Sequence, residues 1–226
     1  MCWNVIKSYS LLWICSDLWQ FISNKMEEKK LHPLSLQRIE NIFFINGITA
    51  ILGWNAALGA FDYFSYVYKG YDVYLYFPVP VFIAYAVTGI LFKKMSTTFS
   101  YGTIVTVGII GMNMSLALML VFSILFKESI DLGFLLTLIV GFFLGFFNNI
   151  AQLSFFAMIN YFGMIVVSRF TIGTAASGLL VIVLRAIITA IFGAEISNVV
   201  PIIIYFSLSV VFNIFDLILN LRLFRT

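Results

Sequence analysis

Polar and aromatic side chains that could recognise a small molecule lie inside long apolar stretches of this chain. Trp54 and Asn55 are neighbours in the first stretch. At ~1.5 Å per helical residue from Ile42, Trp54 lies roughly 18 Å into the bilayer, near its centre. Belt tryptophans lie at the membrane surface instead. Two interpretations stay open: an aromatic wall beside a polar cavity, or a packed indole with Asn55 bonded to a backbone carbonyl.

The fourth apolar stretch carries small and amide residues on one side. Gly141, Gly145, Asn148 and Gln152 follow one another at helical spacing, so they share one face. The two glycines match the small-xxx-small pattern of close helix contacts, and packing is enough to explain them. The amide of Gln152 presents donors and an acceptor, which is the chemistry that recognises the edge of a nucleobase.

The last two stretches combine small residues with charges. Gly173 and Gly178 bracket a small-residue run, which permits close packing or leaves room for a ligand. Arg169 and Asp216 have similar expected depths. Because an unpaired charge in a membrane is costly, we expect an ion pair between them. Arg185 either extends toward the membrane surface or lines a pathway.

Membrane-spanning helices must position these residues, as the composition indicates. Of the 226 residues, 62% are apolar and 10% are charged, and the mean hydropathy is +1.05. A span needs ~20 apolar residues. Six stretches are long enough, near 42–66, 73–92, 101–126, 132–159, 165–193 and 199–221. We therefore expect an all-α membrane protein, a bundle of six transmembrane helices whose short loops make neighbours antiparallel.

The chain divides into two regions. We expect a cytoplasmic N-terminal segment, residues 1–40, and a six-span domain, residues 41–226. The first region is either an interfacial amphipathic helix or a disordered tail, followed by a charged linker. Lysines and arginines gather at both ends and in the loops on one side. The positive-inside rule therefore places both termini in the cytoplasm.

Charge and residue types exclude several functions. The formal net charge is only +3, without a basic face, so we expect no nucleic-acid partner. His32 is the only histidine, and the sequence shows no metal-ligand spacing and no nucleophile elbow. We therefore expect neither an enzyme nor a bound cofactor or metal. The expected partners are the lipid bilayer and a small substrate.

The same residues carry a resemblance to the equilibrative nucleoside transporters. The run Leu52 to Asn55 resembles the Leu-Pro-Trp-Asn motif of that family's first span, although Gly53 replaces the proline. Gln152 falls where the family has its fourth-span glutamine. Gly173 and Gly178 match the Gly-Gln-Gly-x-x-Gly pattern of the fifth span, although its Gln and second Gly are missing here. The resemblance covers roughly residues 42–225.

This resemblance implies a facilitator of nucleosides or nucleobases that works by alternating access. Its fold would resemble the N-terminal half of a major-facilitator-like transporter. The substrate contacts that we assign are Trp54, Asn55, Leu58, Val79 and Gln152. Among these, the indole would wall the base or sugar and Gln152 would hydrogen-bond the base. The glycines of the fourth and fifth spans would support helix packing and substrate access.

The family's spans number eleven, six followed by five, with substrate held between the halves. This chain carries six, so we expect a transporter represented by its N-terminal half, through a fragment, a truncated gene model or a split gene. A half-length protein could also be completed by a second half-transporter or by a homodimer partner. The alternative is a half-transporter without transport activity that serves as a structural or interaction subunit.

Overall fold

The computed structural model describes residues 33–192 and 199–225, so the predicted N-terminal segment lies outside the described residues up to residue 32. Every regular element in the described ranges is a helix. Six of these helices are long and apolar enough to cross a membrane, which confirms the predicted all-α, six-span architecture. They are α2 (Pro33–Gly59), α5 (Pro78–Thr98), α6 (Tyr101–Leu125), α7 (Ile130–Ile159), α8 (Met164–Phe192) and α9 (Val200–Arg225).

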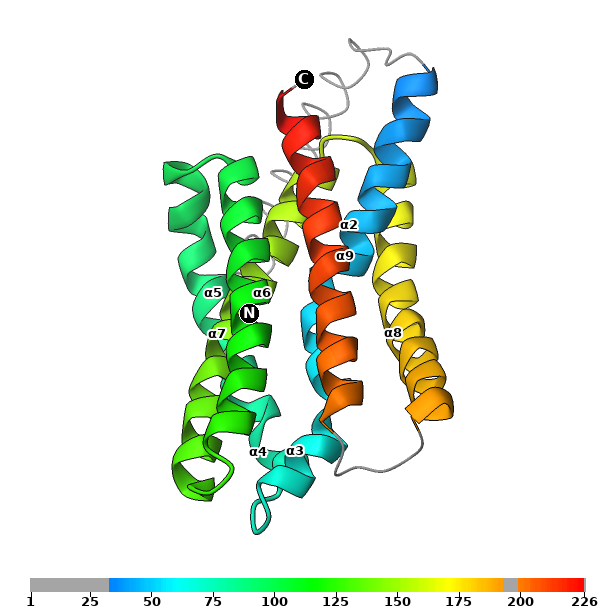
Figure 1. Ribbon diagram of the computed structural model, residues 1–226. Coiled ribbons are helices and arrows are strands. Elements are labelled where there is room, and N and C mark those ends of the chain that lie inside the picture. The colour runs from blue at the N-terminus through cyan, green and yellow to red at the C-terminus, as the bar shows by residue number, and fades with distance from the viewer. Residues whose placement is uncertain (1–32, 193–198, 226) are drawn as a thin grey trace, which may run out of the picture.

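Two short helices, α3 (Phe61–Val67) and α4 (Val73–Tyr76), connect α2 to α5. Figure 1 shows them at one end of the bundle, with the start of α2 and the end of α9 at the opposite end. The described part of the chain therefore enters and leaves the bundle at the same end, as an even number of spans requires.

Local sequence explains where several helices begin and end. The side chain of Ser100 accepts a hydrogen bond of 3.2 Å from the backbone N–H of Thr103, which caps the start of α6. Pro78 occupies the first position of α5, where its missing N–H would have had no helical partner. Gly163, between α7 and α8, has a φ of 90°, a left-handed conformation that glycine adopts at no steric cost.

An aromatic cluster ties the α3–α4 connection to the start of α7. The hydroxyl groups of Tyr68 and Thr137 lie 2.6 Å apart, and the Tyr71 hydroxyl donates to Asp131 Oδ1 at 2.7 Å. The rings of Tyr71 and Phe134 stack with centroids 4.1 Å apart. The hydrogen bond to the Asp131 carboxylate, with smaller effects from burial and nearby charge, raises the pKa of the Tyr71 phenol.

Helix α2 packs against α8 along a contact that we call the α2–α8 seam, centred on Gly47 and Gly173. A Cβ atom added at Gly173 would overlap the carbonyl oxygen of Phe44, and one added at Gly47 would overlap that of Phe170. The two backbones therefore touch directly, the arrangement that small residues allow between membrane helices.

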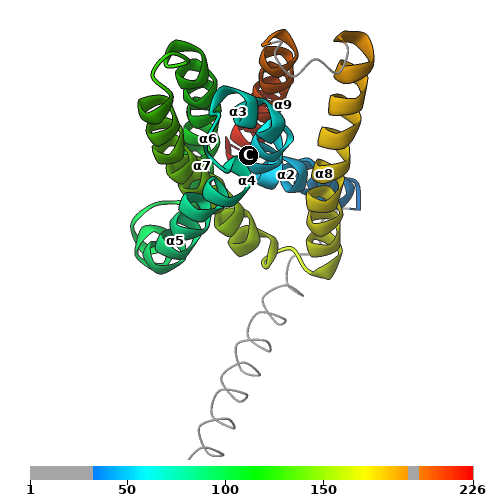
Figure 2. The ribbon, with the colours of Figure 1, turned by 90° about the horizontal axis from the view of Figure 1, so that it is seen from below.

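Glycines also mediate the contacts of α7 with its neighbours. Gly145 faces the backbone of Val81 on α5, whose Cα would lie 2.9 Å from an added Cβ. Gly111 on α6 faces the ring of Phe147, which an added Cβ would overlap. Seen end-on in Figure 2, α5, α6 and α7 lie on one side of α2, with α8 on the other.

Replacing Gly173 by alanine should weaken the bundle, because the added methyl group meets backbone rather than a movable side chain. We expect a loss of roughly 1–3 kcal/mol, read as a lower melting temperature of the purified protein in detergent. Gly178→Ala is the matched control on the same helix. An added Cβ there meets no atom within 4 Å, and alanine favours a helix by about 1 kcal/mol over glycine. Equal melting temperatures for the two variants would contradict the seam.

Candidate functional site

Trp54 lies in a row of aromatic rings that crosses from α2 to α5. Its indole is half-buried and meets Phe61 edge-on at a centroid distance of 6.1 Å and Phe82 at 6.5 Å. The Phe82 ring in turn meets Tyr85 edge-on at 6.4 Å. The structure therefore gives Trp54 aromatic neighbours in both directions, and one of them, Phe82, is 61% exposed.

The row continues onto α7 through an amide. Asn148 Nδ2 donates to the Tyr85 hydroxyl oxygen at 3.0 Å, while Asn148 Oδ1 is buried and has no hydrogen-bond partner in the described part of the chain. We call Trp54, Phe82, Tyr85 and Asn148 the aromatic-amide row. It joins three helices through contacts between polar and aromatic side chains.

The neighbouring amide, Asn149, is a packing group that the sequence analysis did not select. Its Nδ2 donates to the backbone carbonyl of Tyr85 at 3.1 Å and also to the hydroxyl of Thr88. Both acceptors lie on α5. Of the predicted small-residue face, Gly145 packs closely on α5, whereas an added Cβ at Gly141 would meet only ordinary contacts, the nearest at 3.8 Å.

Three predicted substrate contacts lie around the row. Leu58 is one turn from Trp54 on α2 and Val79 is one turn from Phe82 on α5, so each shares a helix face with a member of the row. Leu58 is 38% exposed and Val79 is 50% exposed. Gln152 follows Asn148 by one turn on α7. It is half-buried, and its amide forms no hydrogen bond with any described residue.

The fourth neighbour, Asn55, points elsewhere. Its side-chain Nδ2 donates to Ser177 Oγ on α8 at 3.1 Å, and its backbone carbonyl oxygen accepts from the Tyr205 hydroxyl at 3.4 Å. The Asn55 amide therefore packs in the α2–α8 seam. Its partner is a serine hydroxyl, whereas the packing interpretation expected a backbone carbonyl. Gly173 lies in the same seam, whereas Gly178 faces open space.

The charged residues correct one expectation. Arg169 Nε pairs with Glu40 Oε2 at 3.4 Å, rather than with Asp216 as predicted from depth. The reason is rotational: α8 faces α2 along the seam, whereas Asp216 lies on the side of α9 that packs against Asn46. The guanidinium of Arg185 pairs with Asp62 on α3, a contact that leaves both alternatives for Arg185 open.

Helix α9 carries a buried polar face that the sequence analysis missed. Its members recur every three or four residues and are all buried: Tyr205, Ser209, Asn213, Asp216 and Asn220. The regular spacing is the signal that could have revealed it. Two amide pairs connect this face to other helices, Asn213 with Asn113 on α6 at 2.7 Å and Asn220 with Asn46 on α2 at 2.9 and 3.1 Å.

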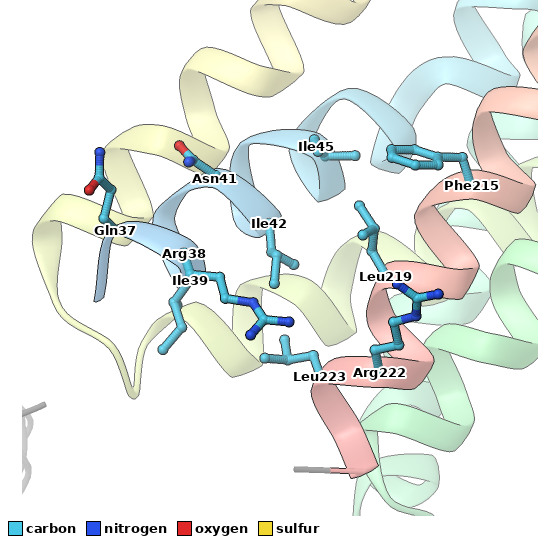
Figure 3. A pocket seen from close by; sticks show the side chains of 10 residues that line it. All are labelled: Gln37, Arg38, Ile39, Asn41, Ile42, Ile45, Phe215, Leu219, Arg222 and Leu223. Carbon is cyan, nitrogen blue, oxygen red and sulfur yellow. The ribbon is translucent and has the colours of Figure 1, made fainter. Parts of the chain in front are cut away.

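A pocket of ≈ 790 Å³ opens between the start of α2 and the end of α9 (Figure 3). Its lining residues are Gln37, Arg38, Ile39, Asn41, Ile42, Ile45, Phe215, Leu219, Arg222 and Leu223. The lining is mostly apolar, with two guanidinium groups toward the end of the bundle. None of the predicted substrate contacts lines this pocket, so it is a feature separate from the aromatic-amide row.

Comparisons with protein-family models, with curated proteins and with solved structures find no match to this chain. The resemblance to the nucleoside transporters and the likeness to a major-facilitator half therefore stay predictions from the sequence.

Tyr85→Phe should destabilise the protein, because it removes the hydroxyl that Asn148 bonds and leaves both ends of a buried amide without a partner. We expect a loss of roughly 0.5–2 kcal/mol in unfolding free energy, measured by denaturant titration in detergent. Tyr161→Phe is the control, since that side chain is exposed and donates to no described residue. If both variants unfold like the wild type, the Tyr85 to Asn148 bond contributes nothing to stability.

Proposed function

We propose that this chain moves nucleosides or nucleobases across a membrane by alternating access, as a half-length member of the equilibrative nucleoside transporters or as the N-terminal part of one. The observation that carries the proposal is the aromatic-amide row, in which ring faces and an amide from α2, α5 and α7 meet within membrane-spanning helices. A nucleobase offers a flat π face and an edge of donors and acceptors. Such a row supplies partners for both.

The unfinished hydrogen bonding of the row supports a polar occupant. Asn148 Oδ1 is buried without a partner, and the amide of Gln152 one turn further has no bond to the described residues. Unsatisfied polar groups inside a membrane are costly and mark functional positions. A base edge that donates to Asn148 and pairs with Gln152 would satisfy both.

The exposed side chains of the row and its neighbours favour a second half that would close the substrate site from the opposite side. Phe82, Val79 and Leu58 are large apolar side chains on one side of the described helices, between 38% and 61% exposed. In a transporter built from two halves, substrate lies between them. The other half would come from a second copy of this chain or from a separate half-transporter.

One observation favours the alternative of a structural subunit without transport activity. Amides that could have lined a pathway are engaged in helix packing instead, Asn55 with Ser177 and Asn149 with Thr88. A bundle that uses its polar groups in this way gains stability from them without any substrate.

Uptake of radiolabelled adenosine, inosine and their free bases into proteoliposomes separates these functions. We expect uptake by the wild type, and a KM about tenfold higher for Trp54→Ala, the equivalent of ~1.4 kcal/mol of lost stacking. Gln152→Ala should weaken uptake without lowering the melting temperature, because its amide has no bond to the described residues.

Phe143→Ala is the matched aromatic control, since that ring is 48% exposed on α7 and lies outside the row. Equilibrium binding of the same substrates is measured in parallel, because a half could bind without completing transport. If the folded wild type shows no uptake and no binding, the proposal is overturned and the structural subunit is favoured.

A further inference from the structure

Asp216 is the one fully buried carboxyl group among the described residues. It is 0% exposed and lies about 14 Å from the end of α9, at ~1.5 Å per residue. The two ion pairs described above join Arg169 to Glu40 and Arg185 to Asp62, so neither includes it. An isolated carboxylate in such surroundings would cost much free energy. The hydrogen-bond partners of Asp216 therefore bear on whether it is protonated.

The orientation of the neighbouring amides follows from one backbone group. The carbonyl oxygen of Asp216 can only accept, and it accepts from Asn220 Nδ2 at 2.9 Å. This turns Asn220 Oδ1 toward Asn46, whose Nδ2 donates to it at 3.1 Å. The side-chain oxygen of Asn46 then accepts from Asn220 Nδ2 at 2.9 Å and also faces the carboxyl group of Asp216.

That arrangement brings two oxygens together. The Asn46 side-chain oxygen lies 2.7 Å from Asp216 Oδ1, the usual length of an O–H···O hydrogen bond. Neither oxygen is a donor when Asp216 is ionised. A proton on Asp216 Oδ1 makes the contact a hydrogen bond, so this orientation of the amide pair belongs to the protonated acid.

Turning both amides gives the complementary state. The amide N–H group of Asn46 then donates to Asp216 Oδ1 at 2.7 Å and to the carbonyl of Ile42 at 3.2 Å. Asn220 must turn as well, which breaks its bond to the Asp216 carbonyl. The hydroxyl of Thr49 adjoins the carboxyl group, and its Oγ1 and Asp216 Oδ2 are both without a bond in the described part of the chain. This orientation suits the ionised acid.

The pocket of Figure 3 is lined by residues of α2 and α9 that are close in sequence to Asn46 and Asp216. Ile42 and Ile45 line it from α2 and precede Asn46 in the sequence, while Phe215 and Leu219 line it from α9 and lie on either side of Asp216.

Other charged residues on the helices around Asp216 do not stabilise its protonated form. These groups are Arg38 and Glu40 on α2, Arg169 and Arg185 on α8, and Arg222 and Arg225 on α9, while α6 carries no charged residue. Arg38 and Arg222 line the pocket, and their positive charges favour the ionised acid. Retention of the proton therefore depends on the burial of the carboxyl group and on the hydrogen bond that the proton makes to the oxygen of Asn46.

We propose that Asp216 reversibly binds a proton inside the membrane, and that the Asn46 and Asn220 amides turn together as the proton enters and leaves. This site does not depend on the proposed function. If the chain is a transporter, the site supplies it with a coupling or gating proton.

Infrared spectroscopy of the purified protein, titrated between about pH 5 and about pH 9, tests the site without any substrate. We expect a carbonyl stretch of a protonated carboxylic acid that disappears as the pH rises. Asp216→Asn should remove this band and still fold, since its amide N–H can donate to Asn46 in place of the acid proton. Glu128→Gln, which neutralises an exposed acid, should leave the band in place.

A second variant reads the amide pair. Asn220→Ala frees Asn46 to present its N–H group to the carboxylate, so the band should be lost at a pH about one unit lower, the effect of one hydrogen bond. If Asp216→Asn fails to fold, ¹³C-labelled aspartate in the wild type identifies the band by its isotope shift. No shifted acid band at any pH in that range, or a band that persists in Asp216→Asn, would overturn the proposal.

Discussion

The α2–α8 seam is the contact on which the rest of this bundle depends. Four pairs mark its length: Glu40 with Arg169, Gly47 with Gly173, Asn55 with Ser177, and Asp62, just beyond α2, with Arg185. The sequence separation of the three bonded pairs stays between 122 and 129 residues. Partners that advance together in this way belong to two parallel helices. Direct backbone contact at the glycines leaves α2 little freedom to rotate.

Because the seam sets the rotation of α2, the other sides of this helix face different neighbours. One side presents Trp54 to α5, where the aromatic-amide row begins. Another presents Asn46 to the buried polar face of α9. A membrane offers no water to satisfy these groups, so each must find a protein partner or an occupant. In the described residues this fails at Thr49, Asn148, Asn213 and Asp216. A substrate has been proposed at Asn148 and a proton at Asp216.

The sequence was sufficient to predict the six spans, because apolar length alone decides them. It did not predict the partner of Arg169, since depth gives the height of a residue but not the direction in which its helix turns it. Tyr85 was missed because aromatic residues occur in every span and carry no distinguishing pattern. The polar face of α9 was predictable from its spacing, whereas the use of Asn55 in packing required the register of α2 against α8.

The polar face of α9 has a consequence for how the protein is made. Of the six described spans, α9 is synthesised last, and it must leave the translocon with five polar side chains on one side. Asn46 and Asn113, which bond two of them, belong to helices already in the bilayer by then. Insertion of α9 is therefore a docking event as much as a partitioning event. The earlier helices provide the surface on which α9 docks, so a defect in α2 would impair the insertion of α9.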